Sequence, residues 1–170
     1  MSQSAPNIGP PERLSTAHDL SQFDCGEPAL DEWLRKRAQQ NDESGASRTY
    51  VVCVRKQVVG YYALAVGAVA HVAAPGRIRR NMPDPVPVMV IGRLAVDRTM
   101  QGQAIGPALL RDAVLRTLQA AEIAGIRAIL VHAISERAKA FYIRSGFMQS
   151  PIEPMTLMIT LEEARRALEG

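Results

Sequence analysis

The middle of the chain contains a strand, a turn, a helix and a second strand, and this unit restricts the fold more than any other feature. Val88–Asp97 is an almost continuous apolar run, which is typical of a strand buried on both faces. The spacing of apolar residues predicts a helix from about Ile105 to Ala121 and a second buried strand at Ile126–Ala133. This order predicts a right-handed crossover and a locally parallel pair of strands.

The segments on either side add further elements. Before the central unit we expect a helix from about Glu27 to Asn41 and a hairpin of Arg48–Arg55 with Val58–Ala70. Three more elements follow the central unit: a helix N-capped by Ser135 and ending near Gly146, a strand at Met155–Leu161, and a terminal helix or tail at Glu162–Leu168. The order predicts an α+β (α/β-like) fold with one mixed, partly parallel sheet and helices on both faces.

Length and composition bound the domain organisation and the location. The chain has 170 residues, 47% of them apolar, which suits one domain with one core. We expect residues 1–12 to be a flexible N-terminal segment and residues 13–170 to form a single domain. The sequence has no signal-peptide pattern, and no apolar run reaches the roughly 20 residues that a membrane span needs. These features favour a soluble, cytoplasmic protein.

The cysteines and histidines give no metal-binding pattern. Cys25 and Cys53 lie far apart, without a CxxC pair or histidines at ligand spacing, so no metal site is predicted. Cys53 lies in an apolar strand pattern and is expected to be a buried thiol. His18 and His71 have no visible partner, and His132 lies in a predicted buried strand, where a structural role is expected.

The segment from Ala73 to Pro87 combines proline with arginine. Its four prolines prevent regular structure, so we expect a loop with at most a short helical turn. The loop carries the chain's densest positive charge, at Arg77, Arg79 and Arg80. Arginine favours bidentate contact with phosphate. A GC-rich genome would also raise the arginine content, so phosphate binding and simple solubility both stay open.

The turn after the central strand, Gln101-Gly102-Gln103-Ala104-Ile105-Gly106, is the strongest chemical signal. A helix N-terminus leaves backbone N–H groups unpaired and carries partial positive charge, and small residues let an anion approach these groups. The pattern predicts a pyrophosphate site, or else a plain tight turn. A P-loop is excluded because no Lys-Ser or Lys-Thr follows Gly106, and a Rossmann GxGxxG is absent.

The strand Leu94–Asp97, this turn, the long helix and the segment Ala138–Phe147 together resemble the GCN5-related N-acetyltransferase (GNAT) superfamily. The superfamily turn is Gln/Arg-x-x-Gly-x-Gly/Ala. Gln101 and Gly106 match it, whereas Ala104 replaces the inner glycine, and alanine tolerates positive φ poorly. The resemblance implies the GNAT fold, with acetyl-CoA as cosubstrate and no metal.

Further motifs are similar to a narrower group, the GNAT toxins of bacterial toxin–antitoxin pairs. These motifs are Phe23–Gly26, Leu30–Leu34, Ala46–Tyr50, Gly60–Tyr62, Gly92–Asp97 and Val131–Ala133. The resemblance implies acetyl transfer to the α-amino group of aminoacyl-tRNA, with glycyl-tRNA as the default substrate. Translation then stops because the blocked aminoacyl-tRNA cannot accept a peptide. It also implies a homodimer and a ribbon-helix-helix antitoxin.

The resemblance also assigns roles to individual residues. The cofactor site is expected to comprise Leu94, Ala95, Val96, Gln101, Gly102, Gln103, Ala104, Ile105, Gly106, Pro107 and Ser135. Tyr142 is expected to protonate the departing CoA thiolate as general acid, with Phe141 beside it packed in the core. No residue stands out as a general base. Contacts with tRNA phosphates are assigned to Arg77, Arg79, Arg80 and Arg93.

Other interpretations stay open for these residues and for the whole chain. Ser135 also suits an N-cap, and Arg93, being in a strand, also suits pairing with a buried acid. A GNAT enzyme for a small amine or a protein amine shares the fold and Tyr142 but needs no basic face. A non-catalytic binding module with this fold would not need Tyr142 at all.

Overall fold

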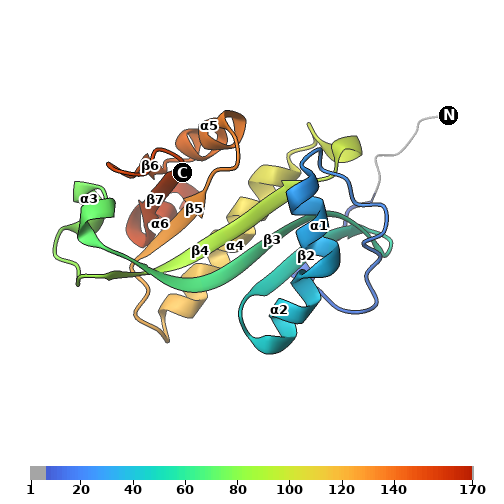
Figure 1. The fold of residues 1–170 in the computed structure, drawn as a ribbon, viewed down its shortest axis with the longest axis horizontal. Coiled ribbons are helices and arrows are strands. Elements are labelled where there is room, and N and C mark those ends of the chain that lie inside the picture. Colours follow the sequence, from blue (N-terminus) through green and yellow to red (C-terminus); the bar gives the residue numbers. More distant parts are fainter. Residues whose placement is uncertain (1–6, 170) are drawn as a thin grey trace. The chain divides into compact units, whose positions relative to one another are not determined.

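The computed structural model describes residues 7–169, and its strands form one seven-stranded sheet in the order β1-β2-β3-β4-β5-β7-β6 (Figure 1). The strands are β1 Glu12–Arg13, β2 Arg48–Val54, β3 Gln57–Val69, β4 Val86–Val96, β5 Ala128–His132, β6 Met148–Gln149 and β7 Thr156–Thr160. β4 and β5 are parallel, whereas β1 with β2 and β7 with both β5 and β6 are antiparallel. The expected mixed, partly parallel sheet is therefore confirmed.

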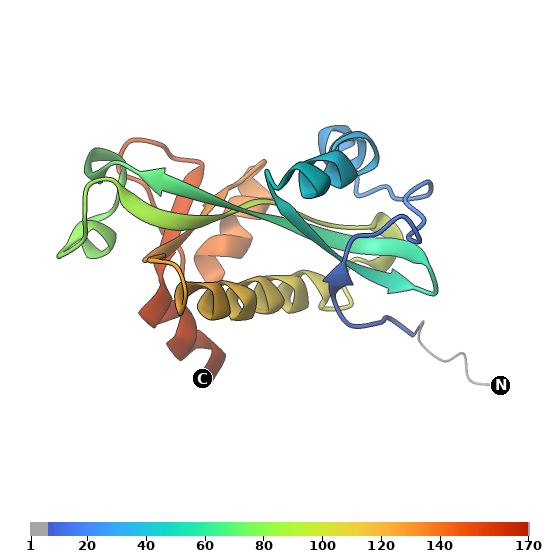
Figure 2. The same cartoon turned by 90° about the horizontal axis from the view of Figure 1, so that it is seen from below.

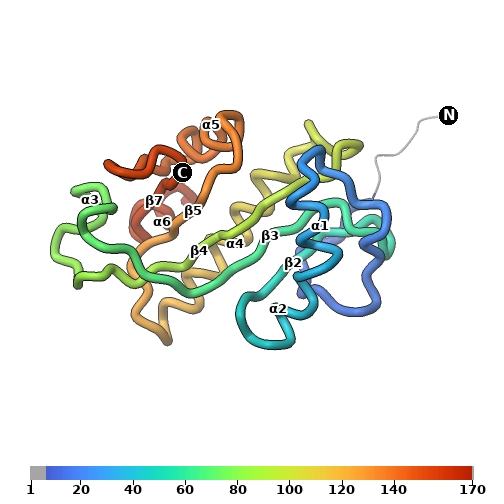
Figure 3. Tube along the Cα trace, in the orientation of Figure 1, coloured from blue at the N-terminus to red at the C-terminus, as the bar shows by residue number. Residues whose placement is uncertain are grey.

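The helices follow the predicted order. They are α1 Pro28–Lys36, α2 Ala38–Ser44, α3 Gly76–Arg79, α4 Ile105–Ala121, α5 Glu136–Arg144 and α6 Leu161–Glu169, with 3-10 turns η1 His71–Ala73 and η2 Arg98–Met100. Between η1 and β4, the proline-rich loop contains only the single turn α3, as expected, and the chain reverses direction through it (Figure 3). The expected end of the loop at Pro87 is wrong, because Val86 and Pro87 already belong to β4. The two-residue strands β1 and β6 were not predicted, because such short segments show no periodicity.

One predicted helix, Glu27–Asn41, is wrong as a continuous element, because the structure divides it into α1 and α2. The chain bends at Arg37, whose φ of −121° lies outside the helical region. The bend lets α2 pack on β2, where the buried Asp42 accepts a hydrogen bond from the backbone N–H of Thr49 and pairs with Arg13. A tertiary contact thus overrides a local helical pattern.

The chain forms two compact units, and β3 and β4 run through both. Unit 1 comprises the residues up to Ala63 together with Arg93–Leu110, and unit 2 comprises Leu64–Gly92 and the chain from Arg111 onward. The expectation of a single domain over residues 13–170 stays a prediction. None of the helices within residues 7–169 is both long enough and apolar enough to span a membrane.

In unit 1, helices lie on both faces of the sheet (Figure 2). Leu30, Trp33 and Leu34 of α1 pack with β2 and β3 residues such as Val51 and Tyr61 on one face. The first turn of α4 lies against the other face. The Tyr61 hydroxyl donates a 2.7 Å hydrogen bond to the backbone carbonyl of Leu30, which fixes α1 on the sheet.

The N-terminal segment lies partly outside the described residues. Within the described part, Ile8 forms a bridge with Val54, and β1 pairs with β2 through Glu12 and Arg13. The backbone N–H of Gly9 also donates to the carbonyl of Cys53 at 2.9 Å. These contacts tie residues 8–13 to β2, and the flexibility expected for residues 1–12 stays a prediction.

In unit 2, the core forms where β4, β5 and β7 are covered by the proline-rich loop. Ile78 of α3 is fully buried with Val86, Val88 and Met158. His71 has partners that the sequence did not reveal: its Nε2 lies 3.1 and 2.8 Å from the carbonyl oxygens of Met82 and Pro83. The histidine therefore holds the arginine-bearing loop in one conformation.

Candidate active site

The turn that follows β4 is anchored by Asp97, a buried carboxylate that the sequence did not single out. Its Oδ1 accepts hydrogen bonds from the backbone N–H and the hydroxyl of Thr99, at 3.0 and 2.7 Å. Its Oδ2 accepts one from the backbone N–H of Asp24 at 3.1 Å. The carboxylate therefore caps η2 and ties the turn to the segment before α1.

The backbone of the turn has two residues in the left-handed region, Gly102 with φ +84° and Ala104 with φ +62°. The non-glycine position is strained, since an L-residue there costs about 1–2 kcal/mol. Within residues 7–169, no backbone hydrogen bond is made by the N–H groups of residues 102–106. Five consecutive donors are thus available to an anion at the start of the 17-residue helix α4.

The side chain of Gln101 closes this turn. Its amide nitrogen donates to the carbonyl of Val96 at 3.2 Å and to that of Cys25 at 3.4 Å. The family position of Gln101 therefore has a structural use, because it holds the turn against the end of β4. Gln103, by contrast, is exposed.

Gly60 in β3 explains how α4 comes so close to the sheet. A Cβ at this position would lie 2.9 Å from Val52 Cγ2, 3.1 Å from Leu109 Cδ1 and 3.2 Å from Ile105 Cγ2. Only glycine leaves room for the first turn of α4 without a shift of its neighbours. The position of the turn Gln101–Gly106 thus depends on a residue of β3.

The end of β4 carries the residues expected to face the pantetheine arm. Ala95 is buried, and Leu94 and Val96 are half-buried. The parallel register of β4 with β5 runs from Val88 to Ile91, so these three residues lie beyond the paired segment. A peptide-like arm needs such a backbone edge, because it pairs with a strand as another strand does.

Arg93, assigned to tRNA phosphate, lies over an aromatic ring. Its guanidinium carbon is 4.3 Å from the centroid of Trp33, which stacks on Tyr61 with centroids 6.0 Å apart and planes inclined by 10°. This is a cation–π contact. Burial lowers the pKa of Arg93 from its ordinary value, and Tyr61 counteracts part of this effect. The alternative prediction, that Arg93 pairs with a buried acid, is wrong, because the structure places the guanidinium over Trp33.

In unit 2, Ser135 caps α5 and Tyr142 belongs to it. The Ser135 hydroxyl accepts a hydrogen bond from the backbone N–H of Ala138 at 3.1 Å, so the expected N-cap is present. Tyr142 is buried against Phe147, with ring centroids 5.4 Å apart. The expectation that Phe141 is the core ring is wrong, since Phe141 is only half-buried. The end of α5 folds back through Phe147, whose N–H donates to the Tyr142 carbonyl.

The hydroxyl of Tyr142 is held in its protonated form. Burial alone raises the pKa of this phenol above its ordinary value of about 10. At neutral pH the group is therefore a proton donor. His132, expected to be buried, is exposed at the end of β5, with Nδ1 3.0 Å from the Thr156 hydroxyl.

The loop arginines are exposed and differ in their contacts. Arg77 forms an ion pair with Glu163 of α6 at 3.1 Å. Arg79 and Arg80 have no ion pair within residues 7–169. Two of the three loop arginines, Arg79 and Arg80, thus have no ion pair within residues 7–169 that would compete with a polyanion.

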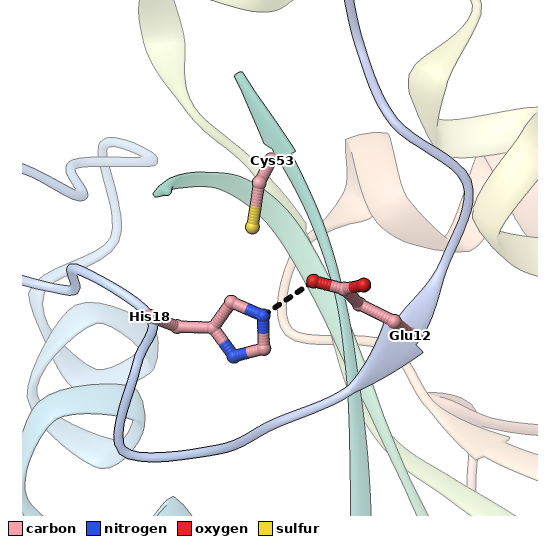
Figure 4. A group of neighbouring side chains, drawn as sticks. All are labelled: Glu12, His18 and Cys53. Carbon is pink, nitrogen blue, oxygen red and sulfur yellow. Dashed lines mark hydrogen bonds and ion pairs between the residues drawn. The ribbon is translucent and has the colours of Figure 1, made fainter. Parts of the chain in front are cut away.

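One group of potential metal ligands lies away from these residues. Glu12, His18 and Cys53 bring an oxygen, a nitrogen and a sulfur within 4.8 Å of one another (Figure 4). The N–H of Ser15 donates to His18 Nδ1 at 2.9 Å, so the ring proton lies on Nε2, which donates to Glu12 Oε1 at 2.6 Å. Burial, then the charge of Glu12, raises the pKa of Cys53 to about 11. The group therefore fixes the N-terminal segment through the hydrogen bonds of His18, beside a protonated thiol.

The predicted site residues fall in both units. Residues 94–107 and Arg93, with the whole turn Gln101–Gly106, belong to unit 1, whereas Ser135, Tyr142 and the loop arginines belong to unit 2. Sequence reasoning missed Asp97, Gly60 and Trp33 as supports of the site. All three lie in motifs that the resemblance used, Leu30–Leu34, Gly60–Tyr62 and Gly92–Asp97, but none was given a role there. A glycine inside a strand pattern, as at Gly60, also marks a close approach of another element.

Comparison with known proteins relates this geometry to a family. A sequence profile described as an acetyltransferase (GNAT) domain matches residues 45–149. A Mycobacterium tuberculosis protein described as a tRNA-acetylating toxin is 55% identical over 155 residues, which cover 91% of this chain and 93% of the relative. The solved structure of AtaT complexed with acetyl-methionyl-tRNAfMet is 28% identical, with a TM-score of 0.87, covering 95% of this chain and 99% of its own. AtaTR bound with acetyl-CoA is 29% identical, with a TM-score of 0.81 and coverages of 95% and 98%.

Proposed function

Since the chain belongs to the GNAT acetyltransferase family, we propose that it transfers acetyl from acetyl-CoA to the α-amino group of an amino acid esterified to tRNA. The observation that carries this substrate is the 55% identity to a tRNA-acetylating toxin across 91% of the chain. The modified aminoacyl-tRNA has no free amine to accept a peptide. The chain would therefore act as a toxin that stops translation.

The residues at the turn suit acetyl-CoA, the cosubstrate of the family. The N–H groups of residues 102–106, which make no backbone hydrogen bond within residues 7–169, are donors for the pyrophosphate, together with the positive end of α4. Pro107 occupies the first turn of α4, where a missing N–H costs nothing. The backbone of Leu94, Ala95 and Val96 would pair with the pantetheine arm, and Ser135 would approach it from the start of α5.

The chemistry is an acyl transfer that needs one proton donor. The neutral α-amine attacks the thioester carbonyl carbon, the C–N bond forms, the C–S bond breaks and the thiolate leaves. We assign the proton that the thiolate takes up to the Tyr142 hydroxyl, because burial keeps this phenol protonated. The α-amine of an aminoacyl ester has a low pKa, so its lost proton can pass to water without a dedicated base.

The arginines supply the proposed contacts with tRNA. Arg77, Arg79 and Arg80 lie exposed on one loop, where contact with phosphates gives affinity and register rather than sequence choice. Arg93, half-buried over the ring of Trp33, supplies a further cation in unit 1. Glycyl-tRNA is the default substrate within this proposal.

The partners and location follow from the same proposal. A cognate antitoxin with a ribbon-helix-helix DNA-binding half would neutralise the toxin, and the toxin would form a homodimer in the cytoplasm. Solved structures with AtaT bound to the C-terminus of the antitoxin AtaR match this chain with a TM-score of 0.82. Sedimentation of the purified chain alone and with its neighbouring gene product measures both assemblies.

The decisive experiment uses radiolabelled acetyl-CoA with three acceptors: charged total tRNA, free amino acids and peptides. Label is expected on charged tRNA and to be released with the amino acid when the ester is hydrolysed. Mass spectrometry of the released acetyl-amino acids then identifies the substrate. Label only in peptides or free amines would overturn the tRNA proposal in favour of a small-amine or protein acetyltransferase.

A further inference from the structure

A pocket of about 590 Å³ lies in unit 2, at the end of the chain's arginine loop, and no step of the acetyl transfer uses it. Its wall is built from three segments far apart in sequence: the residues around the end of α3, the start of β5, and the first turns of α6. The volume is in the range of small-molecule sites and is large enough for a nucleotide rather than a lone ion.

The pocket has an excess of positive charge. Four arginines and two glutamates line it, so two positive charges remain uncompensated. Arg77 pairs with Glu163, and Arg166 pairs with Glu162. The other two cations, Arg80 and Arg127, are exposed and have no ion pair within the part of the chain that the structure describes.

The backbone holds both of these arginines in place. The N–H of Arg127 donates to the carbonyl of Pro87 at 2.9 Å, and its carbonyl accepts from the N–H of Leu161 at 3.4 Å. Arg80 follows α3, and its N–H donates to the carbonyl of Gly76 at 3.1 Å. Asn81 then adopts φ +58°, a left-handed turn that asparagine tolerates, and directs the chain along the pocket wall.

The rest of the wall is apolar or neutral. Ile126 is buried beneath the pocket, and Met82 and Leu161 are half-buried at its side. Asn81 and Thr160 add neutral polar groups, the latter already bonded to Glu163. A pair of free guanidinium groups beside apolar surface suits a phosphate that is joined to a ribose and a base.

We propose that this pocket binds one backbone phosphate of the tRNA, with its ribose and base against Ile126, Met82 and Leu161, through Arg80 and Arg127. The proposal rests on the proposed function, because it names where the same substrate is held. It also separates the arginines that the sequence grouped together: Arg80 lines the pocket, whereas Arg79, its neighbour in the loop, does not.

The test measures steady-state acetylation of charged tRNA by wild type, Arg80→Ala, Arg127→Ala and the matched control Arg165→Ala. Arg165 is an exposed arginine of α6 outside the pocket, so it controls for the loss of one positive charge. We expect each pocket variant to raise KM for charged tRNA by about 3–10-fold and to reduce the slope of log affinity against log salt by about 1. Arg165→Ala should stay within about 2-fold of wild type.

Further measurements decide whether the pocket binds tRNA or another ligand. Arg127→Lys should recover part of the affinity, since lysine keeps the charge but not the bidentate geometry. KM for acetyl-CoA should stay unchanged in both pocket variants; an increase there instead would overturn the proposal by assigning the pocket to the adenosine phosphate of CoA. Equal KM for tRNA in the pocket variants and Arg165→Ala, or weakened binding only of an acidic antitoxin peptide, would also overturn it. Wild type that acetylates no charged tRNA would instead remove the proposed function itself.

Discussion

The turn after β4 and the arginine pocket of unit 2 are both suited to phosphate, but they are built in opposite ways. The turn offers backbone N–H groups of five consecutive residues, supported by Asp97 and Gln101. The pocket offers side chains from three distant segments, and its Arg80 and Arg127 form no ion pair within residues 7–169. A backbone site is compact and fixed, whereas a side-chain site covers more surface and adapts to a long polyanion.

This difference assigns a separate kinetic parameter to each region. Changes at the turn should alter the affinity for acetyl-CoA with every acceptor. Changes in the pocket should alter the affinity for tRNA alone, and with a dependence on salt. Four substitutions test that separation, beginning with one that should affect neither affinity.

Tyr142→Phe should give the largest effect on the reaction rate. It should lower kcat and leave the affinities for acetyl-CoA and tRNA unchanged, so it is the reference for the other substitutions. Removal of a general acid lowers kcat by about 10²–10⁴-fold, equally with charged tRNA and with a small amine acceptor. The phenylalanine keeps the packing on Phe141 and Phe147, so the thermal unfolding temperature should not fall. Since burial raises the pKa of Tyr142, wild-type kcat should also not decline as the pH rises from 7 to about 10. A variant with near-normal kcat would show that the proton comes from elsewhere.

Gly60→Ala should damage the turn without touching the pocket. The new methyl group would lie 2.9 Å from Val52 Cγ2, and the cost of such overpacking is about 1–3 kcal/mol of unfolding free energy. Because Ile105 and Leu109 must move, the start of α4 shifts and KM for acetyl-CoA should rise by about tenfold. Calorimetry and steady-state kinetics measure the two effects.

Gly125→Ala is the matched control for this substitution, because no atom lies within 4 Å of the added Cβ. It should leave both the unfolding temperature and KM for acetyl-CoA unchanged. If Gly60→Ala altered KM for tRNA as much as KM for acetyl-CoA, the two regions would be coupled rather than separate.

The sequence predicted the backbone site far better than the side-chain site. The turn is a contiguous motif, so its residues Gln101, Gly102 and Gly106 predict it from the local sequence alone. The apolar run before it predicts a buried strand equally clearly. The mixed sheet was also predicted from local patterns, because the order strand, helix, strand implies a parallel pair of strands. The family relationship, which the motifs indicated, is confirmed by the profile match and the 55% identity.

The remaining features depend on contacts between distant residues, which no local pattern reveals. The bend at Arg37 arises because α2 packs on β2, and the pairing of His18 with Glu12 needs β1 in place. Arg127 gave no signal at all, since it enters the pocket only through the pairing of strands that brings it beside Leu161. Arg93 was expected beside phosphate or an acid, and the structure places it over Trp33.

Ala104→Gly examines the strain in the turn itself. Alanine at φ +62° is disfavoured, and glycine removes this cost, so we expect about 1 kcal/mol of added stability. For a chain of this size, that corresponds to an unfolding temperature about 2–4 °C higher. KM for acetyl-CoA should fall or stay constant, and KM for tRNA should not change. The converse change, Gly102→Ala at φ +84°, should lower the unfolding temperature by a similar amount. If Ala104→Gly lowered the unfolding temperature, or if Gly102→Ala raised it, the turn would not be held in this conformation.

Glu163→Gln should give the smallest kinetic effect. Unlike the arginine substitutions, it makes the pocket more positive and should lower KM for charged tRNA. It removes the carboxylate that pairs with Arg77 at 3.1 Å, while glutamine can still accept the hydrogen bond from the Thr160 hydroxyl. The Arg77 side chain is 67% exposed, so the lost pair is worth only about 0.2–1 kcal/mol. The freed guanidinium raises the positive charge of the pocket by one. KM for charged tRNA should therefore fall by about 2–3-fold at low salt, an effect that screening removes near 0.5 M salt.

Glu169→Gln is the matched control, because it makes the same charge change at the end of α6, outside the pocket. It should leave KM for tRNA unchanged. If both glutamine variants lowered KM equally, tRNA would respond to the net charge of the chain, and the contrast between a fixed backbone site and a local side-chain pocket would not hold.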